Sequence, residues 1–342
     1  MAVQNTVSAR SGRDLTVEST ASNGEELACP ACGRSSQAGP SEHCGNCELF
    51  ECSACGLQYW SPRTMPDASW YEQMYGGRDQ RILPLEPGHR YFLEDSLAPR
   101  RGALLDIGCG TGNFLAAAQD AGYDVTGIEL DRNAANFARE QLGLDRIRLV
   151  TLGEFTEQPT QNKFDVITFF EVLEHQAAPL EFLRNAKKCL KPRGMIALSV
   201  PNRERRLTGP DMLDYPPNHF LRWNATALKR FLQAERFEIL SVREQPAGVV
   251  HAAQMINMGL KTGMTERVKD STGASFRDLM QLTTGEAGKV LATKPSLRQK
   301  VILLLGRIKY AACFPLAVAA YPYVRVRGYR GTYLYCLAKL RD

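Results

Sequence analysis

The glycine-rich stretch at residues 104–114 constrains the fold more than any other part of this chain. Residues 104–107 form an apolar run that contains the acid Asp106, and Gly108, Gly110 and Gly112 follow before a helical pattern begins. Glycine adopts positive φ angles and lets backbone amides approach a ligand closely, and a helix N-terminus adds partial positive charge. The pattern predicts a strand, a tight turn and a helix around a nucleotide-like ligand.

The spacing of these glycines separates two classes of nucleotide-binding turn. Nicotinamide and flavin enzymes use G-x-G-x-x-G, which would require a glycine at position 113, where this chain has Asn113. The observed G-x-G-x-G pattern therefore disfavours a nicotinamide oxidoreductase and favours another nucleotide-like ligand.

Three further segments follow the turn. Residues 125–129 read as a second apolar strand ending in an acid, about 20 residues past the turn, where a ribose-binding carboxylate is expected. Residues 164–175 combine a buried-strand pattern with E-V-L-E-H, and residues 190–202 hold a strand that ends in P-N. Together these motifs, within residues 91–242, resemble class I S-adenosylmethionine-dependent methyltransferases, in particular a bacterial group with the E-V-L-E-H segment.

The resemblance implies an α/β fold with a Rossmann-like, doubly wound, seven-stranded sheet whose last strand is antiparallel. It also implies S-adenosyl-L-methionine as the cofactor, with Asp106 orienting the turn and Glu129 binding both ribose hydroxyls. Arg90 is a candidate for the cofactor carboxylate. Gly108, Gly110 and Gly112 would line the methionine portion of the cofactor. Glu154, which follows a third expected strand at 148–152, would contact the adenine. Phe170 and Glu171 would lie beside the sulfonium. Glu154 can equally be an ordinary surface acid.

Ten cysteines occur in the chain, and four of them form two C-x-x-C-G knuckles. Cys29, Cys32, Cys52 and Cys55 offer four thiolates, the set that suits tetrahedral structural zinc. Cys44 and Cys47 form a third pair, which belongs to a second site, replaces one knuckle or consists of free thiols. Few basic and aromatic residues cluster here, so a role of this zinc-ribbon-like module in binding nucleic acid is not favoured.

The acidic and imidazole residues near E-V-L-E-H are candidates for the chemistry. At a strand end leading into a helix, Glu171, Glu174 and His175 share one face, and the segment resembles the E-x-x-E-H of ubiquinone-pathway O-methyltransferases and small-RNA 3′-end methyltransferases. That resemblance implies a divalent ion held with a later histidine, here His219. Alternatively, Glu174 and His175 only cap the helix. We expect His175, His219 and Glu171 to act at the acceptor as base or metal ligands.

The chain divides by composition and pattern into six segments. Its hydrophobic and charged content are those of an ordinary globular protein, and no N-terminal apolar stretch indicates a signal peptide. The expected segments are a disordered N-terminus (1–26), the zinc-ribbon-like module (27–63), a helical linker or lid (64–100), the methyltransferase core (101–244), a helical insertion (245–330) and the last core strand (331–342).

The insertion is unusual because residues 301–324 are strongly apolar while the surroundings are basic. From Lys300 onward the chain has eight Lys and Arg residues and one acid, an excess of seven that exceeds the net charge of +5 for the whole chain. Arg307, Lys309 and Pro315 within the apolar stretch argue against a transmembrane helix. Residues 300–330 therefore lie on an anionic membrane surface or pack over the acceptor cleft.

These observations predict an S-adenosylmethionine-dependent enzyme that methylates a small-molecule, sugar-linked or lipid-linked acceptor. It would be cytoplasmic or peripheral at the inner membrane surface, with a structural zinc and a second divalent ion as candidate metals. Two alternatives stay open: an RNA methyltransferase guided by the cysteine module, and a non-catalytic binding module with the same fold. The acceptor and the oligomeric state are not determined by the sequence.

Overall fold

The computed structural model describes residues 28–35, 39–64, 82, 84–157, 163–205, 214–257 and 297–342, and of residues 297–310 only the helical backbone. The segment 1–26, which was expected to be disordered, lies outside these residues. So do residues 65–81 and 83 of the expected linker, and the loops expected near position 263 and at 283–288.

The core is a seven-stranded sheet with the order β10-β11-β8-β7-β4-β5-β6. The pairs β4–β5, β4–β7, β5–β6 and β7–β8 are parallel, whereas β11 runs antiparallel to both β8 and β10. The expected doubly wound sheet with an antiparallel last strand is therefore confirmed. The strands are β4 (Gly102–Ile107), β5 (Tyr123–Glu129), β6 (Ile147–Leu149), β7 (Phe164–Phe170), β8 (Leu190–Pro201), β10 (Phe237–Pro246) and β11 (Arg330–Leu340).

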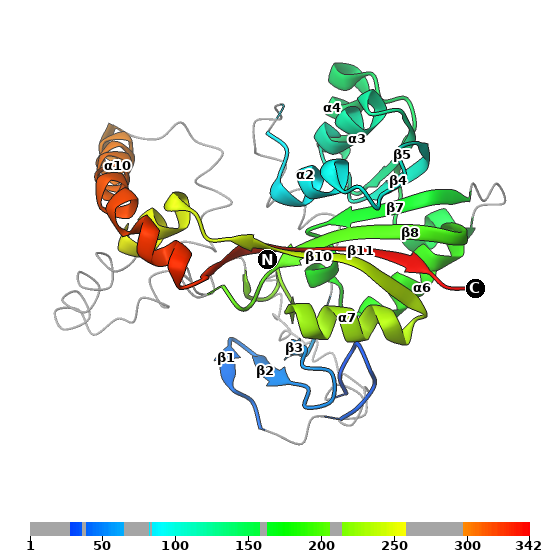
Figure 1. Ribbon diagram of the computed structural model, residues 1–342, viewed down its shortest axis with the longest axis horizontal. Helices are drawn as coiled ribbons and strands as arrows, with labels where there is room; N and C mark the ends of the chain where they lie inside the picture. The colour runs from blue at the N-terminus through cyan, green and yellow to red at the C-terminus, as the bar shows by residue number, and fades with distance from the viewer. Residues whose placement is uncertain are drawn as a thin grey trace, which may run out of the picture.

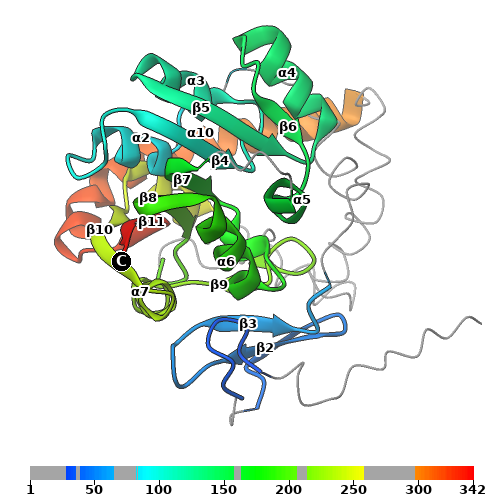
Figure 2. The same cartoon turned by 90° about the vertical axis from the view of Figure 1, so that its right-hand side faces the viewer.

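Helices cover both faces of this sheet, which is why its central strands are continuously apolar. One face carries α2 (Pro87–Glu94), α3 (Asn113–Asp120) and α4 (Arg132–Leu142), as Figures 1 and 2 show. The other carries α5 (Leu152–Glu157), α6 (Pro179–Cys189) and α7 (Ala225–Ala234).

Local sequence sets the ends of several elements. The Asp131 carboxylate caps α4 by accepting from the Asn133 amide, and Gly143 ends that helix in a left-handed conformation. Asn224 caps α7 as expected, accepting from the Ala227 amide at 2.8 Å. The third strand is shorter than expected: β6 ends at Leu149, and Leu152 already begins α5. Hydrophobicity alone does not distinguish a short buried strand from the first residue of a helix.

The N-terminal lobe, residues 28–35 and 39–61, forms a separate four-stranded sheet. Its strands are β1 (Glu42–Cys44), β2 (Cys47–Glu51), β3 (Gln58–Ser61) and β9 (Leu221–Arg222), in that order. The last strand comes from the part of the chain that follows β8, so the lobe's sheet is built from two distant segments of the chain. One hydrophobic core runs through both parts, from Tyr59 and Trp60 in the lobe to Trp223 and Phe231 in the core. Figure 2 shows the lobe beside β9 and α6.

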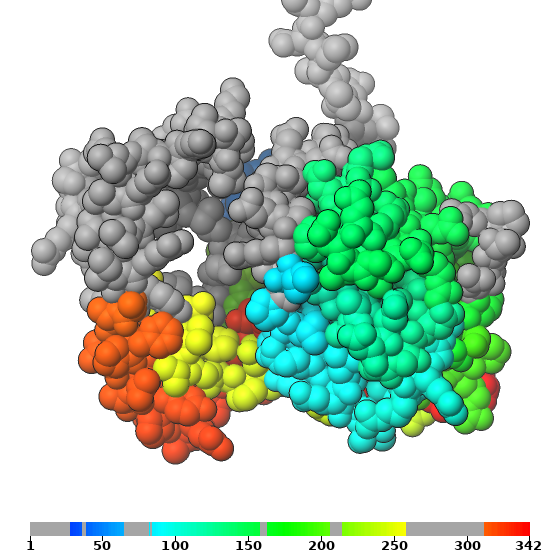
Figure 3. All heavy atoms as spheres, turned by 90° about the horizontal axis from the view of Figure 1, so that it is seen from above, coloured from blue at the N-terminus to red at the C-terminus, as the bar shows by residue number. Residues whose placement is uncertain are grey.

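The insertion before β11 extends from one end of the core. Residues 249–257 are helical, and α10 (Leu297–Val326) is a 30-residue helix. Cys313, Ala317 and Val324 pack against Ala252 and Ala253 in a small core of their own. Figure 3 shows the described end of α10 against this yellow segment rather than on the cyan and green core. Among the described helices, none combines the length and the apolarity needed to cross a bilayer.

Candidate functional site

The glycine turn has the backbone geometry that its sequence predicts. Gly108, Gly110 and Gly112 have φ angles of 74°, 54° and 80°, and Gly112 is the N-cap of α3. A Cβ atom on Gly112 would lie 2.6 Å from Leu144 Cδ1, so neither the conformation nor the space admits a larger residue. The turn is therefore held in one shape at the carboxyl end of β4.

Glu129 lies beside this turn, at the end of β5. Its Oε2 accepts from the Gly110 amide at 2.8 Å, and its Oε1 accepts from the amides of Leu130 and Asp131 at 2.6 and 2.8 Å. An ionised carboxylate has about four acceptor positions, so the three amides leave about one position for a ribose hydroxyl. Burial raises the pKa of Glu129, and the hydrogen bonds from the three amides partly offset this increase. The structure places Glu129 beside the turn as expected, and its binding of both ribose hydroxyls stays a prediction.

Asp106 lies buried inside β4, one residue before the strand ends. Its Oδ1 accepts a hydrogen bond of 2.7 Å from the Thr168 hydroxyl on β7. Burial raises the pKa of Asp106 to about 7, and the nearby charge of Glu129 adds to the effect. A cationic ligand beside Asp106 would favour its charged form, and S-adenosylmethionine carries both an amino group and a sulfonium.

Aromatic rings form one wall beside these carboxylates. Phe170, at the end of β7, meets the rings of His89 and Phe114 edge-on, with centroids 4.8 and 4.9 Å apart. Burial lowers the pKa of His89 to about 4, so this ring is neutral at physiological pH. The neighbouring Arg90, which we expected near the cofactor carboxylate, is exposed and donates to the backbone carbonyl of Leu85.

Glu154 has a local partner instead of facing the turn. Its carboxylate accepts from the amide and the hydroxyl of Thr151 at 2.7 and 2.8 Å. These bonds lower the pKa of Glu154 and close the first turn of α5. A helix-capping role accounts for this acid fully, and the predicted contact with adenine stays a prediction.

A second polar cluster lies just past the end of β7. Glu174 is fully buried in a short 3-10 helix, η1 (Leu173–His175), and neither of its side-chain oxygens has a hydrogen-bond partner among the described residues. Its Oε1 lies 3.9 Å from His175 Nε2 and 3.8 Å from His219 Nε2. These gaps are too long for hydrogen bonds. Donor atoms that share one ion at about 2.1 Å lie roughly 3.0 to 3.4 Å apart at octahedral or tetrahedral angles, so a bound ion would draw these three groups slightly closer together.

Each of the two imidazoles has a polar group near its other nitrogen, and for His175 this group forms a hydrogen bond. His175 Nδ1 lies 2.6 Å from the Asn218 carbonyl oxygen. Because a carbonyl can only accept, Nδ1 must carry the proton. In the neutral ring Nε2 therefore keeps its lone pair. Burial lowers the pKa of His175 to about 4. His219 Nδ1 lies 3.5 Å from Asp214 Oδ1. Ligating or basic histidines are commonly oriented by a carbonyl or carboxylate in this way.

Glu171 lies near this cluster but is not part of the three-residue group that could hold an ion, Glu174, His175 and His219. Its backbone has a positive φ of 54°, and its Oε1 accepts from the Ser199 hydroxyl at 2.8 Å. Burial raises the pKa of Glu171 to about 8. The shared helical face that the sequence predicted for Glu171, Glu174 and His175 is wrong, because the helix starts only at Leu173.

Several polar residues of the site have no signal in the sequence. Arg205 and Asp214 form a buried ion pair that links the end of β8 to the segment that carries His219. Ser199 on β8 holds Glu171. The position of Arg205, three residues after the terminal P-N, was the one available hint. An isolated arginine at that spacing does not by itself predict a functional site.

Comparisons with known proteins agree with this geometry. A family model described as a methyltransferase domain matches residues 78–242. Residues 78–242, hereafter the methyltransferase domain, are thus similar to methyltransferases over just under half of the chain.

The relatives of the methyltransferase domain include two proteins named ubiquinone biosynthesis O-methyltransferase. That of Actinobacillus pleuropneumoniae serotype 7 (strain AP76) is 39% identical over 107 residues, 29% of this chain and 46% of the relative. That of Bordetella avium (strain 197N) is 33% identical over 170 residues, 48% of this chain and 64% of the relative. The chain thus spans less than two thirds of either relative. The crystal structure of Burkholderia thailandensis 1,6-didemethyltoxoflavin-N1-methyltransferase, with bound 1,6-didemethyltoxoflavin and S-adenosylhomocysteine, matches with a TM-score of 0.44 at 15% identity over 89% of this chain and all of that chain.

Four cysteines gather at one point of the lobe that is joined to the methyltransferase domain. All four are free thiols, with Sγ separations of 3.6 Å for Cys29–Cys55 and 3.5 Å for Cys32–Cys52. Tetrahedral ligands at about 2.3 Å from zinc lie roughly 3.8 Å apart, so the set fits one zinc ion. The hydrogen bond from Cys29 lowers the pKa of Cys55 to about 5, which favours a thiolate.

The third cysteine pair does not replace a knuckle. Cys44 and Cys47 face each other across the hairpin between β1 and β2. They are free thiols outside the four-cysteine group. The neighbouring His43 is exposed and lies 3.4 Å from Glu48.

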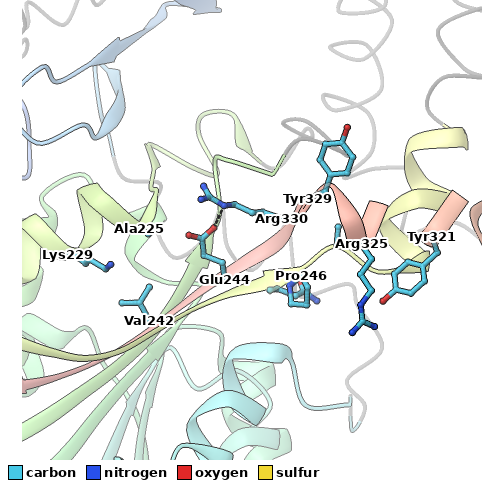
Figure 4. A pocket seen from close by; sticks show the side chains of 12 residues that line it. Ala225, Lys229, Val242, Glu244, Pro246, Tyr321, Arg325, Tyr329 and Arg330 are labelled. Atoms are coloured by element: carbon cyan, nitrogen blue, oxygen red, sulfur yellow. Dashed lines mark ion pairs between the residues drawn. The ribbon is translucent and has the colours of Figure 1, made fainter. Parts of the chain in front are cut away.

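A surface pocket of about 590 Å³ lies elsewhere, where the insertion meets the methyltransferase domain. Tyr321 and Arg325 line it from the α10 side, and Lys229 and Val242 from the core side (Figure 4). Arg330 bridges Glu204 and Glu244 across it. This pocket is separate from the residues of the glycine turn and the histidine cluster, and its ion pairs join the insertion to the core.

Proposed function

We propose that the protein transfers a methyl group from S-adenosylmethionine to a hydroxyl of a small-molecule, sugar-linked or lipid-linked acceptor. The observation that carries this proposal is the buried Glu174, without a hydrogen-bond partner, between the Nε2 atoms of His175 and His219. The cluster follows β7, whose last residue, Phe170, lines the predicted sulfonium position. The names of the O-methyltransferase relatives support an oxygen acceptor.

The mechanism rests on alignment and proton removal. The sulfonium is an activated methyl donor, so the protein mainly holds donor and acceptor in line and excludes water. A hydroxyl loses its proton as it attacks. His175 is neutral at physiological pH and keeps the Nε2 lone pair free, because its Nδ1–H is bonded to Asn218. We assign proton acceptance to His175 or His219.

The same residues fit a divalent ion. A fully buried carboxylate between two imidazoles is stabilised by a cation or by a proton. Burial, with the nearby charge of Glu171, raises the pKa of Glu174 well above its usual range. Glu174, His175 and His219 would hold the ion, with Glu171 beside them. Held by these residues, a divalent ion would supply Lewis-acid chemistry that favours deprotonation of the acceptor hydroxyl.

Substitution of the two histidines tests this assignment. His175→Ala and His219→Ala should each lower turnover about 100-fold or more, the usual contribution of acid–base catalysis, while the affinity for S-adenosylhomocysteine stays within about threefold. His43→Ala, at the exposed tip of the lobe, is the matched control. Release of S-adenosylhomocysteine is measured with catechols and with sugar hydroxyls as acceptors. Unchanged turnover in both variants would remove these residues from the mechanism.

The two alternative functions make different predictions. An RNA methyltransferase binds RNA with an affinity that falls steeply with salt, which a filter-binding assay measures. A non-catalytic module binds S-adenosylhomocysteine and releases no methylated product with any acceptor class. The paired imidazoles around Glu174 argue for catalysis over simple binding.

We also propose that α10 rests on an anionic membrane surface. Leu316, Val318 and Val326 are exposed by 61%, 59% and 85%, no charged residue occurs between 311 and 324, and Arg325 and Arg327 follow. An exposed apolar helix face next to cations suits an anionic bilayer. Intact protein should sediment with phosphatidylglycerol vesicles and not with phosphatidylcholine vesicles, and Leu316→Glu with Val326→Glu should abolish this. A concentration-dependent dimer that these substitutions disrupt, without vesicle binding, would overturn the proposal.

A further inference from the structure

The segment that supplies His219 is held by the cysteine lobe as well as by the core. We call residues 214–224 the acceptor segment; it includes β9, which pairs with β3 of the lobe through Tyr59 and Leu221. The Trp60 amide donates to the Phe220 carbonyl at 2.9 Å, and the Phe220 amide donates to the Glu174 carbonyl at 2.9 Å. One residue, Phe220, therefore connects the lobe to the turn that carries Glu174.

A second connection runs through the side chain of Glu42 on β1. Its Oε1 accepts from the Tyr215 hydroxyl at 2.6 Å, and its Oε2 accepts from Arg222 Nη1 at 2.9 Å. The Arg222 guanidinium also lies over the rings of Trp60 and Tyr215, 5.1 and 4.9 Å from their centroids. Glu42 thus binds the acceptor segment through one residue before His219 and one residue after it.

The four-cysteine group controls the shape of the lobe that makes these contacts. Its second knuckle lies between β2 and β3, with Cys52 directly after β2 and Cys55 three residues before β3. Gly33 and Gly56, each following a knuckle, have φ angles of 72° and 83° and donate to the carbonyls of Cys29 and Cys52. Small modules of this kind fold around their ion, so the position of β3 depends on the ligated state of the thiols.

We propose that the cysteine lobe is a positioning wall of the acceptor site, and that Glu42 is a positioning residue that acts through Tyr215 and Arg222 on His219. This proposal rests on the proposed function of the histidine cluster. The cofactor residues Asp106 and Glu129 lie on β4 and β5, which make no strand pairing with the lobe. Disturbing the lobe should therefore change the histidine cluster and leave cofactor binding intact.

The test uses the full chain with three substitutions. Glu42→Ala removes both bonds to the acceptor segment, and Tyr215→Phe removes only the hydroxyl bond while keeping the ring. Glu48→Ala is the matched control, because Glu48 is an acid on the same hairpin that forms an ion pair with the exposed His43. The chain has five histidines, so ring signals in ¹⁵N-histidine spectra are few enough to assign with single His→Asn variants.

We expect Glu42→Ala to shift the ring signals of His175 and His219, and not those of His89 and His251. Turnover should fall about tenfold or more, the usual effect of losing an orienting partner, with zinc content and the Kd for S-adenosylhomocysteine unchanged. Tyr215→Phe should show a smaller effect of the same kind and decides the matter if Glu42→Ala does not fold. Removing zinc from the wild type should move the same two ring signals.

Two results would overturn the inference. One is that Glu42→Ala and Tyr215→Phe both keep the histidine ring signals and the turnover of the wild type. The other is a parallel loss of cofactor affinity, which indicates general damage instead of positioning. If the wild type transfers no methyl group to any acceptor while the ring signals still respond to Glu42→Ala, the proposed function fails and the coupling stands. If turnover is normal and the signals do not respond, the coupling alone fails.

Discussion

Replacing Asp106 with asparagine should stabilise the ligand-free protein and weaken cofactor binding. The Asp106 carboxyl is 3% exposed, and burial raises its pKa from 3.8 to about 7. Asparagine keeps the Oδ1 that accepts from the Thr168 hydroxyl, and it has no proton to lose. The substitution thus removes the cost of a buried charge while preserving the shape and the one hydrogen bond of the site.

The size of the effect follows from the shift in pKa. Since the folded-state pKa is raised, the contribution of Asp106 to the free energy of unfolding is greatest below pH 4 and declines as the pH rises toward 7. At about 1.4 kcal/mol per pKa unit, the loss is about 2 kcal/mol at pH 5 and about 4 kcal/mol at pH 8. Asp106→Asn should therefore exceed the wild type in stability by about twice as much at pH 8 as at pH 5.

Urea denaturation of both proteins at pH 5 and pH 8 measures this difference, and calorimetry with S-adenosylmethionine measures the affinity. Asp124→Asn is the control, because Asp124 is an acid on the adjacent strand whose side chain is 64% exposed and paired with Arg146; exposed pairs contribute about 1 kcal/mol or less. An advantage for Asp106→Asn that is equal at both pH values, or absent at pH 8, would refute the reasoning. So would undiminished affinity for the cofactor.

Three further substitutions have defined outcomes. Cys52→Ser should remove the zinc that elemental analysis finds in the purified protein, whereas Cys44→Ser should retain it; equal zinc in both variants would contradict the assignment of the site. Asn224→Ala should lower the unfolding free energy by about 1 kcal/mol through loss of the α7 cap, and an unchanged melting temperature would contradict it. Gly112→Ala should abolish cofactor binding in calorimetry, because it adds a 2.6 Å contact with Leu144 to the strain of positive φ. Gly143→Ala has a similar φ of 64° and open space, so it isolates the strain, and equal effects of the two substitutions would refute the role of the contact.

Structural features that depend on neighbouring residues in the sequence could be predicted. The strand, glycine turn and helix at residues 102–120, the acid at the end of β5 and the cap at Asn224 each depend on residues within a few positions of one another. Backbone conformation and capping are local, so the residues that require them can be recognised without knowledge of distant neighbours. The order of seven strands followed from the resemblance that these motifs carry.

Relations between distant residues were decided only by the tertiary structure. Glu171 was expected to join Glu174 and His175 on one helix face, but its positive φ places it before the helix and against Ser199. The pairing of β3 with β9 connects residues more than 150 positions apart, and it makes the cysteine lobe continuous with the segment that carries His219. The sequence by itself predicted which residues are candidates for binding a cofactor or a metal. Which of them meet depends on packing and on strand register, because these arise from contacts between segments that no local pattern encodes.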